Sequence, residues 1–226
     1  MIVTFDLFSA LTDSRTGASR TFAEIAAERG WGMTGPELYD AWDARNKAAQ
    51  RDARPPTTFR EVSRSALVAT YDALGLEPRL AAGDLDRLHD GVGEWPLWPD
   101  VTDAVAAVAG HARVGLLSNV DDDLARATRA HALVDPSLVL SSQRLGAFKP
   151  SPEIYAAARA EAAPEPLVHV AASARDVRGA LEAGLVAVRL VRPGHVVDPD
   201  GPQPAHEVHD AADLAAVVAA LGQDLP

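Results

Sequence analysis

Short apolar runs alternate with alanine-rich stretches along most of the chain, and this alternation limits the possible folds more than any other feature. The runs are apolar throughout, which is typical of parallel strands covered on both faces. The strand candidates are 2–6, 113–119, 138–140, 167–172 and 186–191. The stretches with helical spacing are 100–110, 121–132, 151–162, 174–184 and 210–221. The pattern predicts an α/β fold with a doubly wound, Rossmann-like parallel sheet.

The segment 15–95 interrupts this alternation. It contains amphipathic helical patterns separated by glycine and proline, and it has no convincing strand. We therefore expect an inserted helical cap at 15–95 and a core domain made of 1–14 and 96–226. The proline- and aspartate-rich stretch 196–210 is predicted to be a loop.

The net charge and the composition limit the classes of partner that the chain is expected to bind. The 226 residues carry a formal net charge of −11, which disfavours nucleic acid and anionic membranes because phosphates attract basic surfaces. The chain has no cysteine, which excludes disulfides, thiolate nucleophiles and zinc–thiolate sites. It shows neither a signal-peptide pattern nor an apolar run long enough to span a membrane, so we expect a cytoplasmic protein without a membrane partner.

Polar residues occur where the predicted strands end. Asp6 follows the first strand, Ser118 and Asn119 close the second, Lys149 lies in a loop before a helix, and Asp176 follows the strand at 167–172. The carboxyl ends of parallel strands form the usual ligand site of such sheets. Each residue alone is compatible with a helix cap or a turn. Their ordered occurrence favours one shared site, in which a lysine holds two carboxylates ionised.

These segments resemble the haloacid dehalogenase superfamily. The similar motifs are FDLFSALTD, LLSN, FKPSPEIY and HVAASARDVRGALEAGL, with a helical insertion after the first, and they cover nearly the whole chain. The resemblance implies that Asp6 is the nucleophile and that Ser118 hydrogen-bonds the substrate. It also implies that Lys149 orients Asp6, and that Asp176 positions the lysine or helps to activate water.

Two motifs distinguish the branches of this superfamily. Its phosphatases carry an aspartate two positions after the nucleophile, which protonates the leaving alkoxide, but this chain has Phe8 there. Its magnesium-binding GD pair is replaced by Ala171 and Ala172. Halide leaves without a proton, so the resemblance favours a metal-independent 2-haloacid dehalogenase-like hydrolase that forms an ester on Asp6.

The same resemblance implies substrate- and halide-binding residues. Asn119 and a cap arginine are expected to hold the halide, with Arg45 as the candidate and Arg51 and Arg54 as rivals. Tyr155 matches a family tyrosine near the lysine. The substrate- and halide-binding residues are therefore expected to be Phe8, Arg45, Asn119, Tyr155 and Ser173.

Some positions depart from the dehalogenase pattern. Ala10 replaces a threonine or serine that binds the active-site anions, and Ser9 is expected to point elsewhere if its segment is regular. Ala171 replaces a serine, Ser173 replaces an asparagine, and Arg175 is expected to bring a positive charge to the pocket rim. Two alternatives therefore remain: a phosphatase of a small phosphometabolite with a weak Mg²⁺ site, and a catalytically impaired binding protein on the same fold.

The expected partner is a small anionic substrate, and a homodimer is compatible with the resemblance. No metal and no cofactor are expected, except Mg²⁺ under the phosphatase alternative. Histidines with metal-ligand spacing are not found in the sequence.

Overall fold

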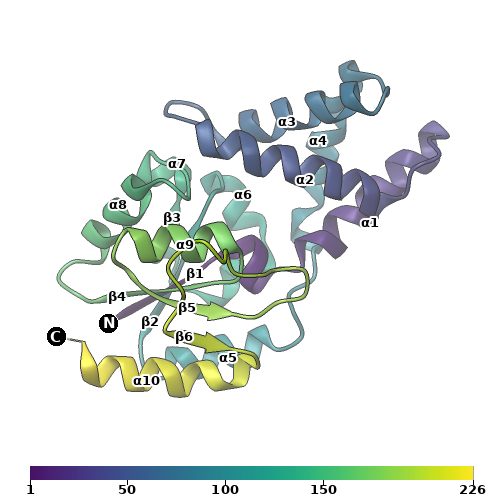
Figure 1. The fold of residues 1–226 in the computed structure, drawn as a ribbon. Coiled ribbons are helices and arrows are strands. Elements are labelled where there is room, and N and C mark those ends of the chain that lie inside the picture. Colours follow the sequence, from purple (N-terminus) through teal and green to yellow (C-terminus); the bar gives the residue numbers. More distant parts are fainter. Residues whose placement is uncertain (226) are drawn as a thin grey trace.

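A computed structural model describes residues 1–225, and its strands form a parallel sheet in the order β3-β2-β1-β4-β5-β6 (Figure 1). Each neighbouring pair of strands runs parallel. The strands are β1 (Ile2–Phe5), β2 (Arg113–Ser118), β3 (Val139–Ser141), β4 (Leu167–Ala171), β5 (Val186–Leu190) and β6 (His206–Val208). The predicted doubly wound α/β fold is confirmed, with β1 and its Asp6 at the centre of the sheet.

The edge strand β6 corrects one expectation. It lies inside the stretch 196–210, which was predicted to be a loop. It pairs with β5, where His206 lies opposite Val188 and Val208 lies opposite Leu190. Because β6 has three residues and buries only Val208 among them, it leaves no apolar run that a sequence pattern could reveal.

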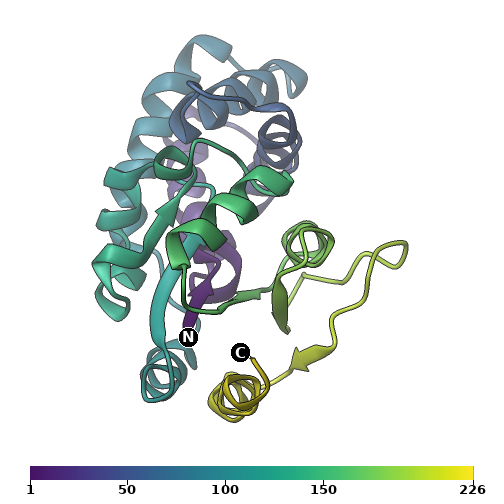
Figure 2. The ribbon, with the colours of Figure 1, turned by 90° about the vertical axis from the view of Figure 1, so that its left-hand side faces the viewer.

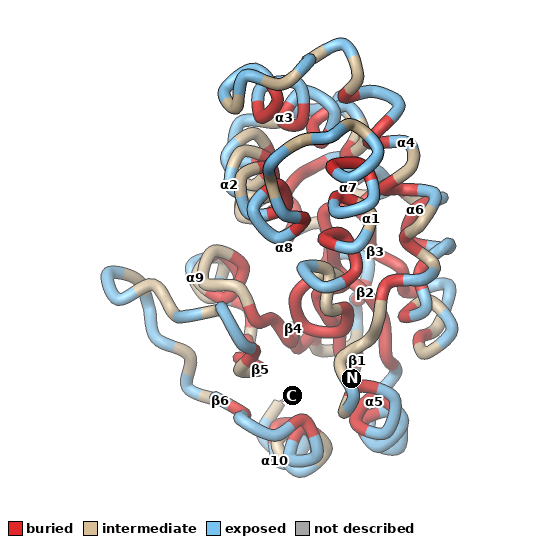
Figure 3. The backbone as a smooth tube through the Cα atoms, turned by 90° about the vertical axis from the view of Figure 1, so that its right-hand side faces the viewer, coloured by how far each residue is buried: buried red, intermediate tan, exposed pale blue. Residues whose placement is uncertain are grey.

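Helices cover both faces of the sheet. Helices α5 and α10 pack against each other on one face, and α7, α8 and α9 lie on the other (Figures 1 and 2). The core helices are α5 (Val101–Ala109), α6 (Asp122–Ala127), α7 (Ser142–Leu145), α8 (Pro152–Ala162), α9 (Ala174–Glu182) and α10 (Leu214–Asp224). This double cover explains why β1 and β4 are buried along their full length (Figure 3).

The apolar core is divided by the sheet. Ile2 and Leu117 belong to a cluster with Ile154 and Tyr155 of α8. The opposite cluster contains Val3 and continues through α5 and α10 into the inserted helices. Neighbouring positions of β1 therefore enter different clusters, as the alternating side-chain directions of a strand require.

The segment between β1 and β2 contains four cap helices, α1 (Ser14–Arg29), α2 (Gly35–Asp52), α3 (Phe59–Ala73) and α4 (Ala81–Asp90). They lie together beyond one end of the sheet (Figure 1). Both α2 and α3 start with a capping box, formed by Thr34 with Glu37 and by Thr58 with Glu61. The domain boundaries at 14–15 and 95–96 stay a prediction.

No helix within residues 1–225 is long and apolar enough to cross a membrane.

Candidate active site

Asp6 lies directly after β1 and starts an unusually wide helical turn. Leu7–Leu11 form a π-helix with Asp6 as its N-cap, and the turn brings Ser9 back over the carboxylate. The Ser9 backbone N–H donates to Asp6 Oδ2 at 3.0 Å, and the Ser9 hydroxyl donates to the same oxygen. The expectation that Ser9 points elsewhere is therefore wrong, because it assumed a regular backbone.

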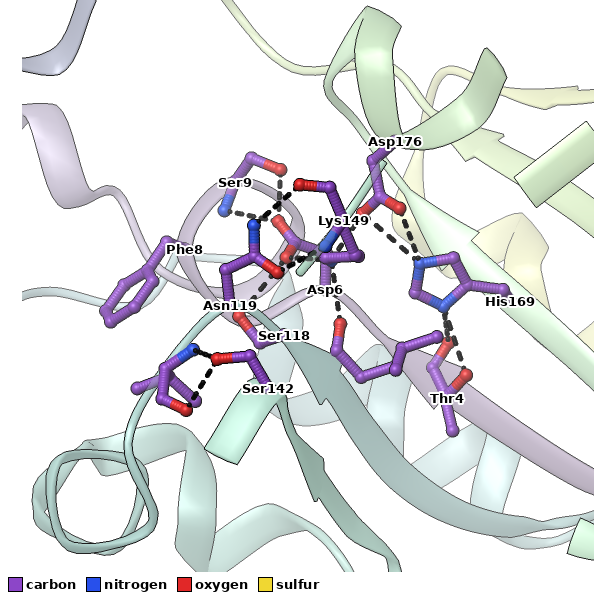
Figure 4. A network of polar contacts seen from close by, with 12 residues as sticks. Thr4, Asp6, Phe8, Ser9, Ser118, Asn119, Ser142, Lys149, His169 and Asp176 are labelled. Atoms are coloured by element: carbon purple, nitrogen blue, oxygen red, sulfur yellow. Dashed lines mark hydrogen bonds and ion pairs between the residues drawn. The ribbon is translucent and has the colours of Figure 1, made fainter. Parts of the chain in front are cut away.

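Lys149 connects the two carboxylates of the site (Figure 4). Its Nζ donates to Asp6 Oδ1 at 2.7 Å, to Asp176 Oδ2 at 2.5 Å and to the Leu117 carbonyl at 2.8 Å. Burial alone would lower the pKa of Lys149, but the charges of Asp176 and Asp6 outweigh it and raise the pKa above 10.5. Burial would likewise raise the pKa of Asp6, but the charge of Lys149 holds it below 3.8. Asp6 is therefore ionised at neutral pH.

Asp176 lies in the first turn of α9 and is held by several donors. The Tyr155 hydroxyl donates to Oδ1 at 2.8 Å, and His169 Nε2 lies 3.2 Å from each carboxylate oxygen. Against the effect of burial, Lys149 and His169 lower the pKa of Asp176 far below its usual range. The carboxylate is therefore a fixed anion that holds the lysine.

His169 is a site residue that sequence reasoning missed. It lies in the middle of β4 and is fully buried, and its Nδ1 is 3.0 Å from Thr4 Oγ1 on β1 (Figure 4). A histidine inside the apolar run LVHVAA was the available signal, because a buried imidazole needs a polar partner.

Ser118 and Asn119 lie at the end of β2 and make different contacts. Ser118 Oγ is 3.4 Å from Asp6 Oδ1, so it lies beside the Asp6 carboxylate. The Asn119 side chain accepts from the Lys149 backbone N–H at 2.7 Å and donates to the Lys149 carbonyl at 2.9 Å. Its Nδ2 also donates to Gln50 Oε1 on α2 at 2.9 Å. Both N–H groups of Asn119 are therefore engaged, and in this conformation they position the lysine loop instead of reaching for a halide.

A cavity of about 560 Å³ joins this cluster to the cap. Phe8 lines it and stacks on Phe59 of α3, with ring centroids 6.0 Å apart. Phe8 therefore supplies an apolar wall to the cavity that Asp6 also lines. The predicted residues that line the cavity are Asp6, Phe8, Ser118, Asn119, Lys149, Ser173 and Asp176.

Two predicted residues do not line the cavity. Tyr155 is fully buried in the cluster that includes α8, and its hydroxyl contacts Asp176 from there. Arg45 is not among the described residues that line the cavity, and its Nη1 donates to the Ala41 carbonyl on its own helix. The rivals Arg51 and Arg54 are exposed. The arginines that line the cavity are Arg15 and Arg175, and Arg175 is the residue that was expected to bring a positive charge to the pocket.

The alanines that depart from the family pattern are all buried. Ala10 is fully buried, and its carbonyl accepts from Arg192 at 3.1 Å. Position 10 has no hydroxyl, but the Ser9 hydroxyl donates to Asp6 from the neighbouring position. Ala171 and Ala172 are fully buried at the end of β4.

The residues at the site do not fit a magnesium ion. Mg²⁺ requires an octahedron of oxygen ligands. The carboxylates here are Asp6 and Asp176, and the ammonium of Lys149 is bonded to both. Within the described chain, no cluster of three or more aspartate, glutamate or histidine side chains is arranged to hold a metal.

Similarity to known proteins identifies the family of the chain. A family model described as haloacid dehalogenase-like hydrolase matches residues 1–184. The chain belongs to this hydrolase family. No curated protein matches the chain in sequence.

Solved structures of this family share the whole fold. A defluorinating L-2-haloacid dehalogenase is 26% identical, with a TM-score of 0.80 over 96% of this chain and 94% of the other. A second L-2-haloacid dehalogenase is 27% identical, with a TM-score of 0.75 over 97% and 98%. The L-2-haloacid dehalogenase from Xanthobacter autotrophicus is 22% identical, with a TM-score of 0.79 over 96% and 97%, and this likeness concerns the fold alone.

Proposed function

We propose that this hydrolase is a metal-independent 2-haloacid dehalogenase with Asp6 as its nucleophile. The observation that carries the proposal is the environment of Asp6. An ammonium holds the carboxylate ionised at 2.7 Å, and an apolar Phe8 lines the cavity where a proton donor would otherwise stand. This environment suits a leaving group that departs as an anion and needs no proton.

The reaction proceeds in two steps. An oxygen of Asp6 attacks the carbon that bears the halogen, the carbon–halogen bond breaks, and its electron pair leaves with the halide. Water then adds to the carbonyl of the resulting aspartyl ester. The ester bond breaks, and one proton of the water goes to the oxygen that leaves with the 2-hydroxy acid. The other proton is released to solvent, and Asp6 is regenerated as a carboxylate.

Lys149 and Asp176 act as an oriented pair in this scheme. Asp176 accepts hydrogen bonds from Lys149 and Tyr155, and its low pKa makes it a poor base. Of the two roles considered for Asp176, the contacts support positioning of the lysine. Ser118 faces Asp6 and is placed to contact the substrate.

Halide release tests this proposal. The purified protein, treated with a chelator, is expected to release chloride from racemic 2-chloropropionate, and the Asp6→Asn variant is expected to release none. Mass spectrometry of rapidly quenched wild type should show the ester on Asp6. Turnover of phosphate esters that requires Mg²⁺, without halide release, would establish the phosphatase alternative instead. Absence of both turnover and ester would establish the impaired binding protein.

A further inference from the structure

Three charged groups of the buried cluster do not balance. Asp6 and Asp176 are both ionised, and Lys149 is the cation bonded to both of them. These three groups sum to one negative charge, and His169 contacts Asp176 and not Asp6. An anionic substrate that approaches Asp6 therefore needs a further cation nearby, because charges interact strongly where they are buried.

Most cations in the cavity wall already have a carboxylate partner. Arg15 pairs with Asp40 at 2.7 Å, and Lys47 pairs with Asp43 at 2.5 Å. Lys149 is shared between Asp6 and Asp176. Among the lysines and arginines of the described chain that line the cavity, Arg175 stands apart, because no carboxylate lies within ion-pair distance of it.

Arg175 is held in place by neutral groups from the cap. Its Nη1 donates to the Lys47 carbonyl at 2.9 Å, and its Nη2 donates to Gln50 Oε1. Gln50 is itself buried and also accepts from Asn119. These contacts fix the direction of the guanidinium without neutralising it. Burial lowers the pKa of Arg175, while Asp176, Asp6 and Asp43 act on it from a longer distance.

We infer that Arg175 is the residue that binds the anionic group of the substrate, and that α2 of the cap orients it for this task. The inference rests on the proposed function for the identity of that anion, which is either the carboxylate of a 2-haloacid or the departing halide. It reassigns to a core arginine, adjacent to Asp176, the anion-binding role that was expected of Arg45.

Binding of unreactive anions tests the inference separately from turnover. Propionate represents the carboxylate and bromide represents the halide, and each is titrated into the wild-type protein by calorimetry. The Arg175→Met variant is expected to bind at least one of them about tenfold more weakly or worse, because a charge-assisted hydrogen bond is lost. The anion that loses affinity identifies the group that Arg175 receives.

Two further variants separate binding from folding. Gln50→Glu keeps Arg175 and places a carboxylate beside its guanidinium, so it should weaken binding of the same anion by competition. Arg178→Met is the matched control on the same helix, because Arg178 pairs with Glu182 and Asp198 and lies outside the cavity lining. It should bind both anions like the wild type.

The inference is overturned if Arg175→Met binds both anions normally, if Arg45→Met alone loses binding, or if the wild type binds neither anion. If anions bind through Arg175 but 2-chloropropionate is not turned over, the proposed function fails while the anion site stands. If chloride is released and Arg175→Met retains anion binding, the inference fails while the proposed function stands.

Discussion

Among single residues, Asp6 is distinguished by the number of donors that hold its two carboxylate oxygens. Asp6 Oδ1 accepts a hydrogen bond from Lys149 Nζ and lies near the Ser118 hydroxyl. Asp6 Oδ2 accepts hydrogen bonds from the backbone N–H and the hydroxyl of Ser9. An ionised oxygen that is aimed by fixed donors loses little freedom when it reacts, so the geometry favours attack on a carbon placed in the cavity.

Ser9→Ala is expected to lower the rate of ester formation about tenfold. The change removes a hydrogen bond to a charged oxygen but leaves the backbone N–H of residue 9 in place, and such a bond contributes ~1.5–3 kcal/mol. Quenched single-turnover experiments with 2-chloropropionate measure the rate, and a thermal melt confirms that the fold is kept. An unchanged rate would show that the hydroxyl only stabilises the π-helical turn.

At the scale of elements, the cap and core are joined through helix ends and side chains. Asp121 lies three positions after Ser118, the last residue of β2. It is the N-cap residue of α6 but makes no side-chain capping bond there. Its carboxylate accepts from the backbone N–H groups of Phe59 at 2.8 Å and Arg60 at 3.0 Å, the first residues of α3. Asp121 of the core domain therefore caps the N-terminus of α3, which belongs to the helical insertion.

Asp121→Ala is expected to loosen the first turn of α3 and to destabilise the protein by about 1 kcal/mol, as the loss of a helix cap usually does. Hydrogen exchange should become faster at the amides of Phe59 and Arg60. Asp123→Ala is the matched control, because it removes an exposed pair with Arg60 and such pairs contribute ~0–1 kcal/mol. Equal exchange in the two variants would contradict the capping role.

Sequence patterns predicted most of these elements but not all of their contacts. The strands that form the centre of the sheet are four or more residues long and buried, so their apolar runs are plain in the sequence. The strand β6 was missed because pairing with β5, and not its own composition, makes it a strand. The contact between Asp121 and α3 was missed because it joins residues 62 positions apart.

At the scale of the whole molecule, one buried cluster links the stability of the fold to pH. The pKa values of Asp6 and Asp176 are lowered on folding, so their stabilising contribution is complete above the unfolded value of about 3.9 and is lost as the pH falls through the folded values. The pKa of Lys149 is raised, so its contribution is lost only as the pH rises above 10.5. Between these limits the cluster contributes a constant stabilisation.

Lys149→Met is expected to reverse the dependence of stability on pH below neutrality, so that the variant becomes more stable as the pH falls from 7 to 5. Without the ammonium, two buried carboxylates repel each other and the pKa of the pair rises. The variant should lose about 3–5 kcal/mol of unfolding free energy at pH 7, and part of the loss should be recovered at pH 5, where a proton is taken up. Urea denaturation at both pH values measures this. A variant that is less stable at pH 5 than at pH 7 would contradict the interpretation.

The doubly wound fold and the meeting of Asp6, Ser118, Lys149 and Asp176 could be predicted from the amino-acid sequence. Both follow from local patterns, since parallel strands bring their carboxyl ends to one edge of a sheet. The other groups that complete the site depend on how distant segments pack. Ser9 reaches Asp6 because the backbone forms a π-turn, and His169 reaches Thr4 because β4 lies beside β1. Arg175 lines the cavity while Arg45 does not, because the packing of the cap on the core sets which arginine borders the cavity.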